Sequence, residues 1–473
     1  MSSRGPAALV QRPPTGAPVP DRSRRIGILA GGGRLPLMIA ESVTERGGAV
    51  HIVGIESEAD AAIARFPHTW VNWGQVGRMV ATLRAEGGVM VIAGGVRRPD
   101  LWKVRPDWGF FASLPQILAM MKGGDDSVLS RVVRFFEAKG LEVLGAHEVA
   151  PDLLAQSGRL GAAALDGRSR RDADLGFAVR AVLGPLDAGQ AVVVADGEVL
   201  AIEGAEGTDA MLRRVAGTRS RGGDAGRRGV LAKGPKPGQE LRVDMPAIGP
   251  RTVELAAAAG LAGVALEAGA VLLLDRAEAV PAADALGLAI EGLPKTSQGG
   301  STPTPNPSPH SSGAPPARRG GESGWHKWGG RPDHPLRLVG RLRPNARTGA
   351  DVEKGLAAVR CLAPFGAGEA VVVARAYLLA IAAAEPTLAV LERTRALRQW
   401  GVGARRRVGV LVCRADASPW DAGRVASLLE RAAEAGLSGV AVTGAPEALE
   451  AFAGAGGLAD RHGLFLLSRE GHP

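Results

Sequence analysis

The 473-residue sequence contains only two cysteines, Cys361 and Cys413, which are too far apart for a CxxC motif. They are also too few for a disulfide framework, so we expect a protein of the reducing cytoplasm. Residues 1–24 contain several prolines and arginines, but no continuous apolar core precedes a small-residue cleavage site. They therefore predict a disordered tail and not a secretory signal.

Aromatic residues make up only 4% of the chain, whereas 57 Lys and Arg exceed 48 Asp and Glu, for a net charge of +9. Such a basic excess favours anionic partners such as nucleotides, phospholipid surfaces or nucleic acid. A basic face without interleaved aromatic side chains is poorly suited to stacking bases. We therefore expect no nucleic-acid partner and assign the excess to phosphate binding or solubility.

The most apolar stretch, Ala256 to Leu274, approaches the length of a membrane span, but Glu267 and three glycines interrupt it. It predicts a buried helix followed by a buried strand. The motifs GxSxG and HExxH do not occur, and the eight histidines are scattered. These absences argue against covalent catalysis and favour metal-assisted attack by water.

The alternation of short apolar runs with longer amphipathic ones predicts an α/β protein. We expect a Rossmann-like domain at 25–150, in which a helix runs from Asp125 or Asp126 to Lys139, a connector at 151–171, and a distinct α/β domain at 172–292. Residues 293–335 are rich in Pro, Ser and Gly and predict a flexible linker.

The last segment, 336–473, repeats the preceding domain. The sequence from Asp172 aligns without gaps with that from Asp351, at an offset of 351 − 172 = 179 residues. Later anchors give 409 − 229 = 180 and 436 − 260 = 176, so the second copy has lost four residues between them. The chain therefore contains a duplicated domain, and the shortened region is the one with the densest polar chemistry.

A glycine-rich turn, Gly31-Gly32-Gly33-Arg34-Leu35-Pro36, follows the first expected strand. Backbone amides at Gly32, Gly33 and Arg34 could hold a phosphate at the start of the following helix. Glu56 falls near the position of the ribose-binding acid in dinucleotide sites, although Pro36 replaces the third glycine of that motif. A tight turn without a ligand is the alternative interpretation.

Two further candidates belong to the same domain. Arg97 follows an expected strand and could bind phosphate, but a solvated basic loop explains it equally well. Asp125 and Asp126 could lie near a metal or ribose, although capping the following helix is the more common role of such residues.

The densest polar segment extends from Lys233 through Lys236 and Gln239 to Asp244. Prolines and glycines hold it as a loop, its lysines suit phosphoryl oxygens, and Asp244 offers the hard oxygen ligand that Mg²⁺ prefers. A structural loop whose charges face water is the weaker alternative.

A second polar cluster contains Glu203, Glu206, Gly207 and Thr208, directly after an apolar strand. The Thr208 hydroxyl could bind a sugar or phosphate, and Glu203 could assist metal or ribose binding. Helix capping by Thr208 is the alternative and is compatible with these roles.

The motifs GILAGGGRLP, GGDDSVL, FEAKGLEVLGAHEVAPDLL, EGAEGTDAML and KGPKPGQELRVDMPAIGPRT occur in this order between about residues 25 and 292. This region resembles the UDP-2,3-diacylglucosamine diphosphatases of lipid A biosynthesis. The resemblance implies Mg²⁺-dependent hydrolysis to UMP and 2,3-diacylglucosamine 1-phosphate, with Asp244 as the catalytic, metal-associated residue. It also implies substrate contacts at Gly32 to Arg34 and around Thr208. A diacylated substrate is compatible with peripheral contact with the inner membrane.

The second copy departs from this pattern. Glu203 becomes Ala382, Gly207 becomes Pro386, Lys233 becomes Cys413, and the segment with Asp244 is replaced by the shorter ADASPWDAG. We therefore predict an inactive duplicate that keeps the fold and could keep a surface for homo-oligomer formation. The alternatives to a hydrolase are a non-catalytic nucleotide-sugar binding protein and, on the glycine turn and Glu56, a nicotinamide-dependent oxidoreductase.

Overall fold

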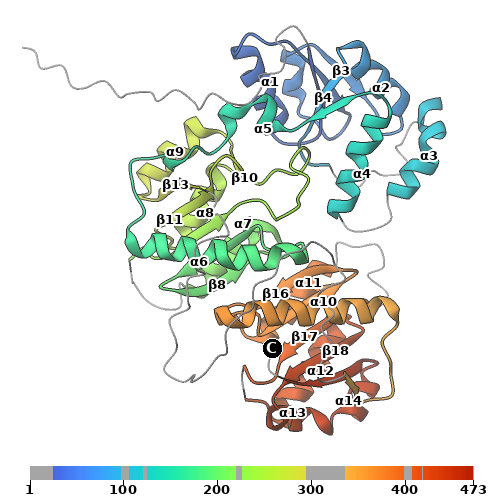
Figure 1. The fold of residues 1–473 in the computed structure, drawn as a ribbon, viewed down its shortest axis with the longest axis vertical. Coiled ribbons are helices and arrows are strands. Elements are labelled where there is room, and N and C mark those ends of the chain that lie inside the picture. Colours follow the sequence, from blue (N-terminus) through green and yellow to red (C-terminus); the bar gives the residue numbers. More distant parts are fainter. Residues whose placement is uncertain are drawn as a thin grey trace, which may run out of the picture. The chain divides into compact units, whose positions relative to one another are not determined.

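The computed structural model describes residues 25–96, 106–120, 125–219, 226–294, 336–398, 407–417 and 419–471. The expected tail, residues 1–24, lies outside these ranges, as does Arg97. Of the expected linker, only residues 293 and 294 are described. The chain divides into two compact units (Figure 1): Met1–Met121 with Ser130–Asp152, and Lys122–Leu129 with Leu153–Pro473.

The first unit contains a five-stranded parallel sheet in the order β3-β2-β1-β4-β5. Its strands are β1 (Ile26–Ala30), β2 (Val50–Ile55), β3 (His68–Val71), β4 (Val89–Ala93) and β5 (Glu142–Leu144). Its helices are α1 (Leu35–Glu45), η1 (Ala61–Arg65), α2 (Val76–Ala85), α3 (Trp108–Met120), α4 (Asp125–Ala138) and α5 (Ala146–Val149). The central strand β1 is apolar throughout, because a parallel sheet is buried on both faces. This order is that of doubly wound nucleotide-binding sheets and confirms the expected α/β fold.

The first C-terminal copy is a six-stranded sheet in the order β6-β13-β11-β9-β7-β8. Its strands are β6 (Gly158–Arg159), β7 (Ala191–Ala195), β8 (Glu198–Ile202), β9 (Val230–Lys233), β11 (Gly263–Glu267) and β13 (Ala289–Leu293). Its helices are η3 (Pro151–Leu153), α6 (Gly167–Leu183), η4 (Gly184–Leu186), α7 (Gly207–Arg219), α8 (Pro250–Ala258) and α9 (Arg276–Ala285). Two further short strands, β10 (Ala247–Ile248) and β12 (Leu272–Leu273), pair in parallel and form a separate two-stranded sheet.

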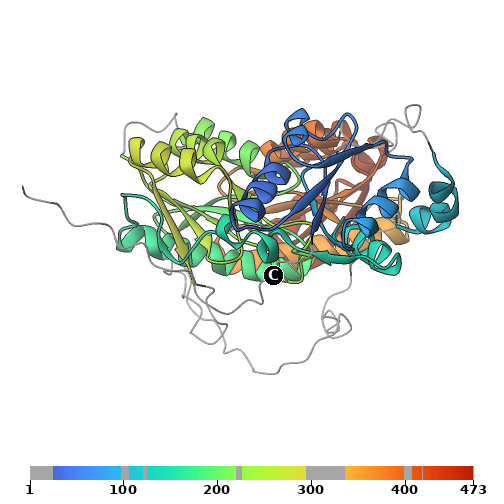
Figure 2. The same cartoon turned by 90° about the horizontal axis from the view of Figure 1, so that it is seen from above.

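Strand β7 shows how this sheet forms the middle of three layers. Val192 and Val194 belong to the apolar cluster that contains α6, whereas Ala191 and Val193 belong to the cluster of α7, α8 and α9. Because successive side chains of a strand point to opposite faces, α6 covers one face and the other three helices cover the opposite one. The view from above in Figure 2 shows helices on both sides of the strands.

The second copy repeats this architecture with the strand order β14-β19-β18-β17-β15-β16. Its strands are β14 (Arg337–Leu338), β15 (Ala370–Ala374), β16 (Tyr377–Ile381), β17 (Val410–Arg414), β18 (Gly439–Gly444) and β19 (Phe465–Glu470). Its helices are α10 (Ala346–Leu362), η6 (Ala363–Phe365), α11 (Thr387–Arg398), α12 (Ala422–Glu434), α13 (Pro446–Ala453) and α14 (Gly456–Arg461). The prediction that the duplicate keeps the fold agrees with this order.

Residues 151–171 do more than connect two domains, which corrects the expectation for this segment. Strand β6 pairs antiparallel with β13 and forms the edge of the sheet. Helix α6 begins at Gly167, because the Asp166 side chain accepts a hydrogen bond from the Ser169 amide at 2.7 Å. The apolar stretch from Ala256 forms the end of α8 and then β11, a helix followed by a strand as predicted.

Candidate functional site

Three strands of the first copy end at the same edge of its sheet. Lys233 is the last residue of β9 and lies opposite Leu266 of β11 and Ala191 of β7. Glu203 follows β8, and its amide donates to the Ala191 carbonyl at 2.9 Å. The sheet order therefore brings Glu203 and Lys233 together with Glu267, the last residue of β11, although they are distant in sequence.

Thr208 joins Glu203 to Lys233 in a buried hydrogen-bonded group. The Lys233 Nζ donates to the Thr208 Oγ1 at 2.7 Å, and that hydroxyl donates to the Glu203 Oε2 at 3.0 Å. Lys233 and Thr208 are only 6% and 8% exposed. The fold thus brings together three residues from two separate polar clusters in the sequence, with Thr208 in the first turn of α7.

Burial shifts the ionisation of both charged members of this group. It raises the pKa of Glu203, and the positive charge of Lys233 opposes part of that shift. It lowers the pKa of Lys233, and Glu203 is the largest opposing influence, followed by Asp209. Desolvation thus outweighs the mutual attraction, so the pair costs folding free energy. Perturbed groups of this kind concentrate at functional sites.

Asp244 lies on the loop between β9 and β10 and is oriented by Gln239. The Gln239 Nε2 donates to the Asp244 Oδ2 at 2.6 Å, while the Gln239 Oε1 accepts from the Lys236 amide at 2.9 Å. The Lys236 Nζ in turn contacts Asp187 Oδ1 at 2.7 Å. The negative charge of Asp244 also acts on Lys233, which places the two predicted clusters within electrostatic range of each other.

The ends of this loop are fixed by backbone and side-chain bonds. The Asp244 amide donates to the Glu240 carbonyl at 3.0 Å, and Arg242 forms a two-pronged ion pair with the Glu240 carboxylate at 2.8 Å. Just beyond, Ala247 and Ile248 pair with Leu272 and Leu273. The Asp244 carboxylate is consequently held on a braced loop and not on a free strand of chain.

Arg180 is a residue of this site that the sequence analysis missed. Its Nη2 donates to the Pro235 carbonyl at 2.7 Å, and its Nη1 lies 3.7 Å from the Glu267 carboxylate. Burial lowers the pKa of Arg180 to about 10. The gapless alignment contained a signal for it, because Val359 replaces Arg180 in the second copy.

A cavity of about 220 Å³ lies beside the loop. Its polar lining comes from Arg180, Lys236, Gln239 and Glu267, and its apolar lining includes Phe177 and Leu241. Asp244 does not line it. A cavity with two cations and an amide among its walls suits an anionic ligand that also carries apolar parts.

Glu206 and Gly207, which were predicted to contact substrate, each have a structural role in the protein. The Glu206 carboxylate is 4% exposed and is engaged by Arg214 and Arg393, so it is used within the protein. Gly207 has a positive φ of 78°, which glycine adopts readily and proline cannot. Pro386 at the corresponding position shows that the second copy does not keep this backbone conformation.

The glycine turn of the first unit packs against a second glycine turn. The Gly32 amide donates to the Gly95 carbonyl at 2.6 Å and the Gly95 amide returns a bond to Gly32 at 2.9 Å. The Gly31 amide is also used, by Ala93 at 2.8 Å. A phosphate site here would therefore depend on Gly33 and Arg34 and not on Gly32, which corrects part of the expectation.

The remaining candidates predicted between residues 25 and 150 are less defined. Asp125 and Asp126 are the first two residues of α4, and their side chains lie outside the described part of the structure. Arg97 also lies outside it. The Glu56 carboxylate is 3.5 Å from the Asn72 amide nitrogen. A role for any of these residues stays a prediction.

The second copy has lost the buried group. Ala382 and Cys413 stand in place of Glu203 and Lys233, and both are fully buried. Thr387, the counterpart of Thr208, instead donates to the Glu369 carboxylate at 2.8 Å. Asp421 caps α12 through the Arg424 amide at 2.8 Å and so has a structural role. These contacts support the prediction of an inactive duplicate.

Within the described ranges, no three His, Cys, Asp or Glu side chains are grouped closely enough to hold a metal by themselves. In the same part of the chain, no helix combines the length and apolar character needed to cross a bilayer.

Fold and site together define an α/β protein with a duplicated C-terminal domain, of which the first copy holds the buried group Glu203–Thr208–Lys233. The chain belongs to the LpxI family: the LpxI N-terminal domain model matches residues 25–153, and the LpxI C-terminal domain model matches 156–291 and again 337–467. The family resemblance and the duplication are thereby confirmed.

A protein of Caulobacter vibrioides named UDP-2,3-diacylglucosamine pyrophosphatase LpxI is 44% identical over 273 residues, which cover 57% of this chain and 98% of that protein. The prediction of a hydrolase is confirmed at the level of this family, and an oxidoreductase is not supported. Because 273 residues cover nearly all of the relative, that protein is too short to include a second C-terminal copy.

Proposed function

We propose that this chain hydrolyses the phosphoanhydride of UDP-2,3-diacylglucosamine to UMP and 2,3-diacylglucosamine 1-phosphate, using Mg²⁺. The observation that carries the proposal is the pair of linked clusters in the first copy, Glu203–Thr208–Lys233 and Gln239–Asp244. The named activity of the Caulobacter relative supports the same reaction. We place the reaction in the cytoplasm, with the diacylated substrate reached at the inner membrane surface.

The cations of the site supply the electrostatic part of the reaction. Lys233 and Arg180 are buried and their charges are poorly screened, so they stabilise negative charge on a nearby diphosphate more strongly than surface residues would. Lys236 lines the cavity beside the loop, where its charge can neutralise a phosphoryl oxygen. The Thr208 hydroxyl is held by Glu203 with its oxygen toward Lys233.

Asp244 is the residue that would hold Mg²⁺. Gln239 binds the Asp244 Oδ2 and so fixes the direction of the carboxylate, while substrate phosphates complete the ligand set that this single acid cannot supply. When bound, Mg²⁺ polarises the phosphoryl group and lowers the pKa of a coordinated water.

The test is UMP release from UDP-2,3-diacylglucosamine with Mg²⁺ by the full chain and by Asp244→Asn. The substitution keeps the size of the side chain but removes its charge, so we expect a loss of about 100-fold or more in kcat/KM. The matched control is Asp421→Asn, an acid in the corresponding segment of the second copy, which should leave the rate unchanged.

Two results would count against the proposal. Full activity of Asp244→Asn would remove Asp244 from the metal site while leaving the reaction intact. Tight binding of the substrate by the unmodified chain, measured by calorimetry, without UMP release would instead favour a non-catalytic nucleotide-sugar binding protein.

A further inference from the structure

The two C-terminal copies touch through contacts that obey a two-fold relation. The Ala205 amide donates to the Leu379 carbonyl at 3.0 Å, and the Ala384 amide donates to the Leu200 carbonyl at 3.4 Å. The partners correspond in the alignment, because 384 − 205 = 179 and 379 − 200 = 179. Each copy thus uses the same backbone groups toward the other, as the subunits of a symmetric dimer do.

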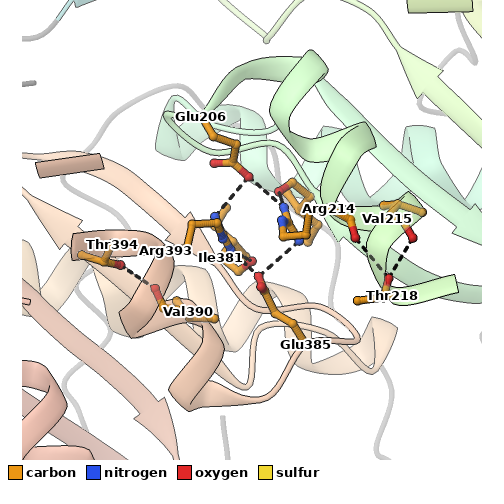
Figure 3. A network of polar contacts seen from close by, with 10 residues as sticks. Glu206, Arg214, Val215, Thr218, Ile381, Glu385, Val390, Arg393 and Thr394 are labelled. Carbon is orange, nitrogen blue, oxygen red and sulfur yellow. Dashed lines mark hydrogen bonds and ion pairs between the residues drawn. The ribbon is translucent and has the colours of Figure 1, made fainter. Parts of the chain in front are cut away.

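Four buried side chains repeat the same relation (Figure 3). Arg214 contacts Glu206 at 2.8 Å and Glu385 of the second copy at 3.2 Å. Arg393 contacts Glu206 of the first copy at 3.1 Å and also pairs with Glu385. Each arginine therefore bridges both carboxylates. The side chains are between 4% and 15% exposed, so solvent screens this network weakly.

An apolar core continues across the same boundary. Val179 and Leu183 of α6 belong to one buried cluster with Val352, Val359 and Leu362 of α10. In addition, a side chain on Gly204 would come within 2.5 Å of the Leu379 carbonyl. A shared core and close backbone approach are characteristic of a permanent interface.

The substitutions in the second copy separate this surface from the chemical site. Glu206 and Arg214 are kept as Glu385 and Arg393, whereas Glu203 and Lys233 became Ala382 and Cys413. The residues that cross the boundary remain, although the charged group beside them has been lost.

We propose that the second copy acts as a covalently attached partner subunit. It covers the surface of the first copy that a second chain would need in order to form a symmetric dimer. The network also anchors the start of α7, since Glu206 lies two residues before Thr208. The full chain is then a monomer with two joined C-terminal copies and one chemical site. The inference concerns association and does not depend on the proposed reaction.

The test uses the full chain with a specific protease site placed between residues 300 and 320, cleaved after purification. Light scattering coupled to size exclusion should show the mass of one chain before cleavage and the same mass afterwards, because the fragments stay paired. Separation of the fragments, or the mass of two chains before cleavage, would overturn the proposal.

Arg393→Glu identifies the surface that holds the fragments together. It places a third carboxylate against Glu206 and Glu385, and we expect the dissociation constant of the cleaved fragments to rise at least about tenfold. Arg395→Glu is the control, because Arg395 is exposed on the same helix. Circular dichroism before cleavage checks folding, and unchanged association of a folded Arg393→Glu protein would show that the pairing surface lies elsewhere.

Discussion

The two C-terminal copies have nearly the same fold but carry different side chains at one edge of the sheet. In each, helix α6 or α10 carries a glycine where it meets the sheet: a side chain on Gly176 would lie 2.6 Å from Ala232, and one on Gly355 would lie 2.3 Å from Val412. Asp172 and Asp351 each accept two amides of the following hairpin, at 2.7–3.1 Å. These shared features build the sheet and its helices.

Several of the differences fall on buried charged groups, which cost folding free energy. The first copy buries Arg180 and Lys233 and partly buries Glu203, whereas the second has Val359, Cys413 and Ala382 at these positions. Burial shifts the pKa values of the first set toward the neutral forms. Once the site had no function, apolar replacements would relieve this cost without altering the fold. The comparison teaches that the site is an addition to the scaffold and not one of its supports.

Transferring a residue of the second copy into the first should produce the largest effect. Lys233→Cys leaves Glu203 buried without its opposite charge, so we expect a loss of about 3 kcal/mol in unfolding free energy and at least about 100-fold in UMP release. Calorimetric unfolding and the release assay measure the two changes separately.

The double change Glu203→Ala with Lys233→Cys is the sharper form of this experiment. It reproduces the second copy, so stability should return to or exceed that of the original chain while activity stays lost. If the double variant is as unstable as Lys233→Cys, the charged pair supports the fold and the comparison fails.

A smaller effect is expected at Gln239, whose counterpart is missing from the second copy. Gln239→Glu keeps the acceptor for the Lys236 amide but turns the donor to Asp244 into a carboxylate oxygen. We expect kcat/KM to fall about 10- to 100-fold, as for other residues that orient a metal ligand.

The Mg²⁺ concentration needed for half-maximal activity should change along with the rate. Repulsion between the two carboxylates disturbs the metal ligand first, so a rate loss with an unaltered Mg²⁺ requirement would assign Gln239 to substrate binding alone.

Much of the fold could be predicted from sequence because it depends on local patterns. The short apolar runs AVVVA, VLAIE and GVALE predict strands of the first copy, and the gapless repeat predicts the duplicate. The edge strand β6 was missed because Gly158 and Arg159 form only two residue pairs with β13 and have no apolar alternation. Such short edge strands leave almost no signal in composition.

The chemical site was predicted in part for a similar reason. Lys233, Thr208 and Asp244 lie in conspicuous polar loops, but which side chains face each other depends on the sheet order, which the sequence does not state. Glu206 looked like part of the same cluster, yet its carboxylate binds Arg393, which is 187 residues away. Arg180 lies within α6, where a single arginine is indistinguishable from a solvated one until its burial is known.

The smallest expected effect is on the pH dependence of stability. Burial raises the pKa of Glu203 above its ordinary value of 4.5, so the folded state holds a proton that the unfolded state has released. Unfolding free energy therefore falls as pH rises from 4.5 through the raised pKa of the folded state, and the loss persists at neutral pH.

Glu203→Gln cannot ionise and should lack this fall. Its stability relative to the original chain should thus increase from pH 4.5 to 7, as measured by urea unfolding. Glu198→Gln, on the exposed start of β8, should show no such trend. A stability difference at Glu203 that does not change with pH would mean that the pKa of Glu203 is the same in the folded and unfolded states, which contradicts the expected effect of burial.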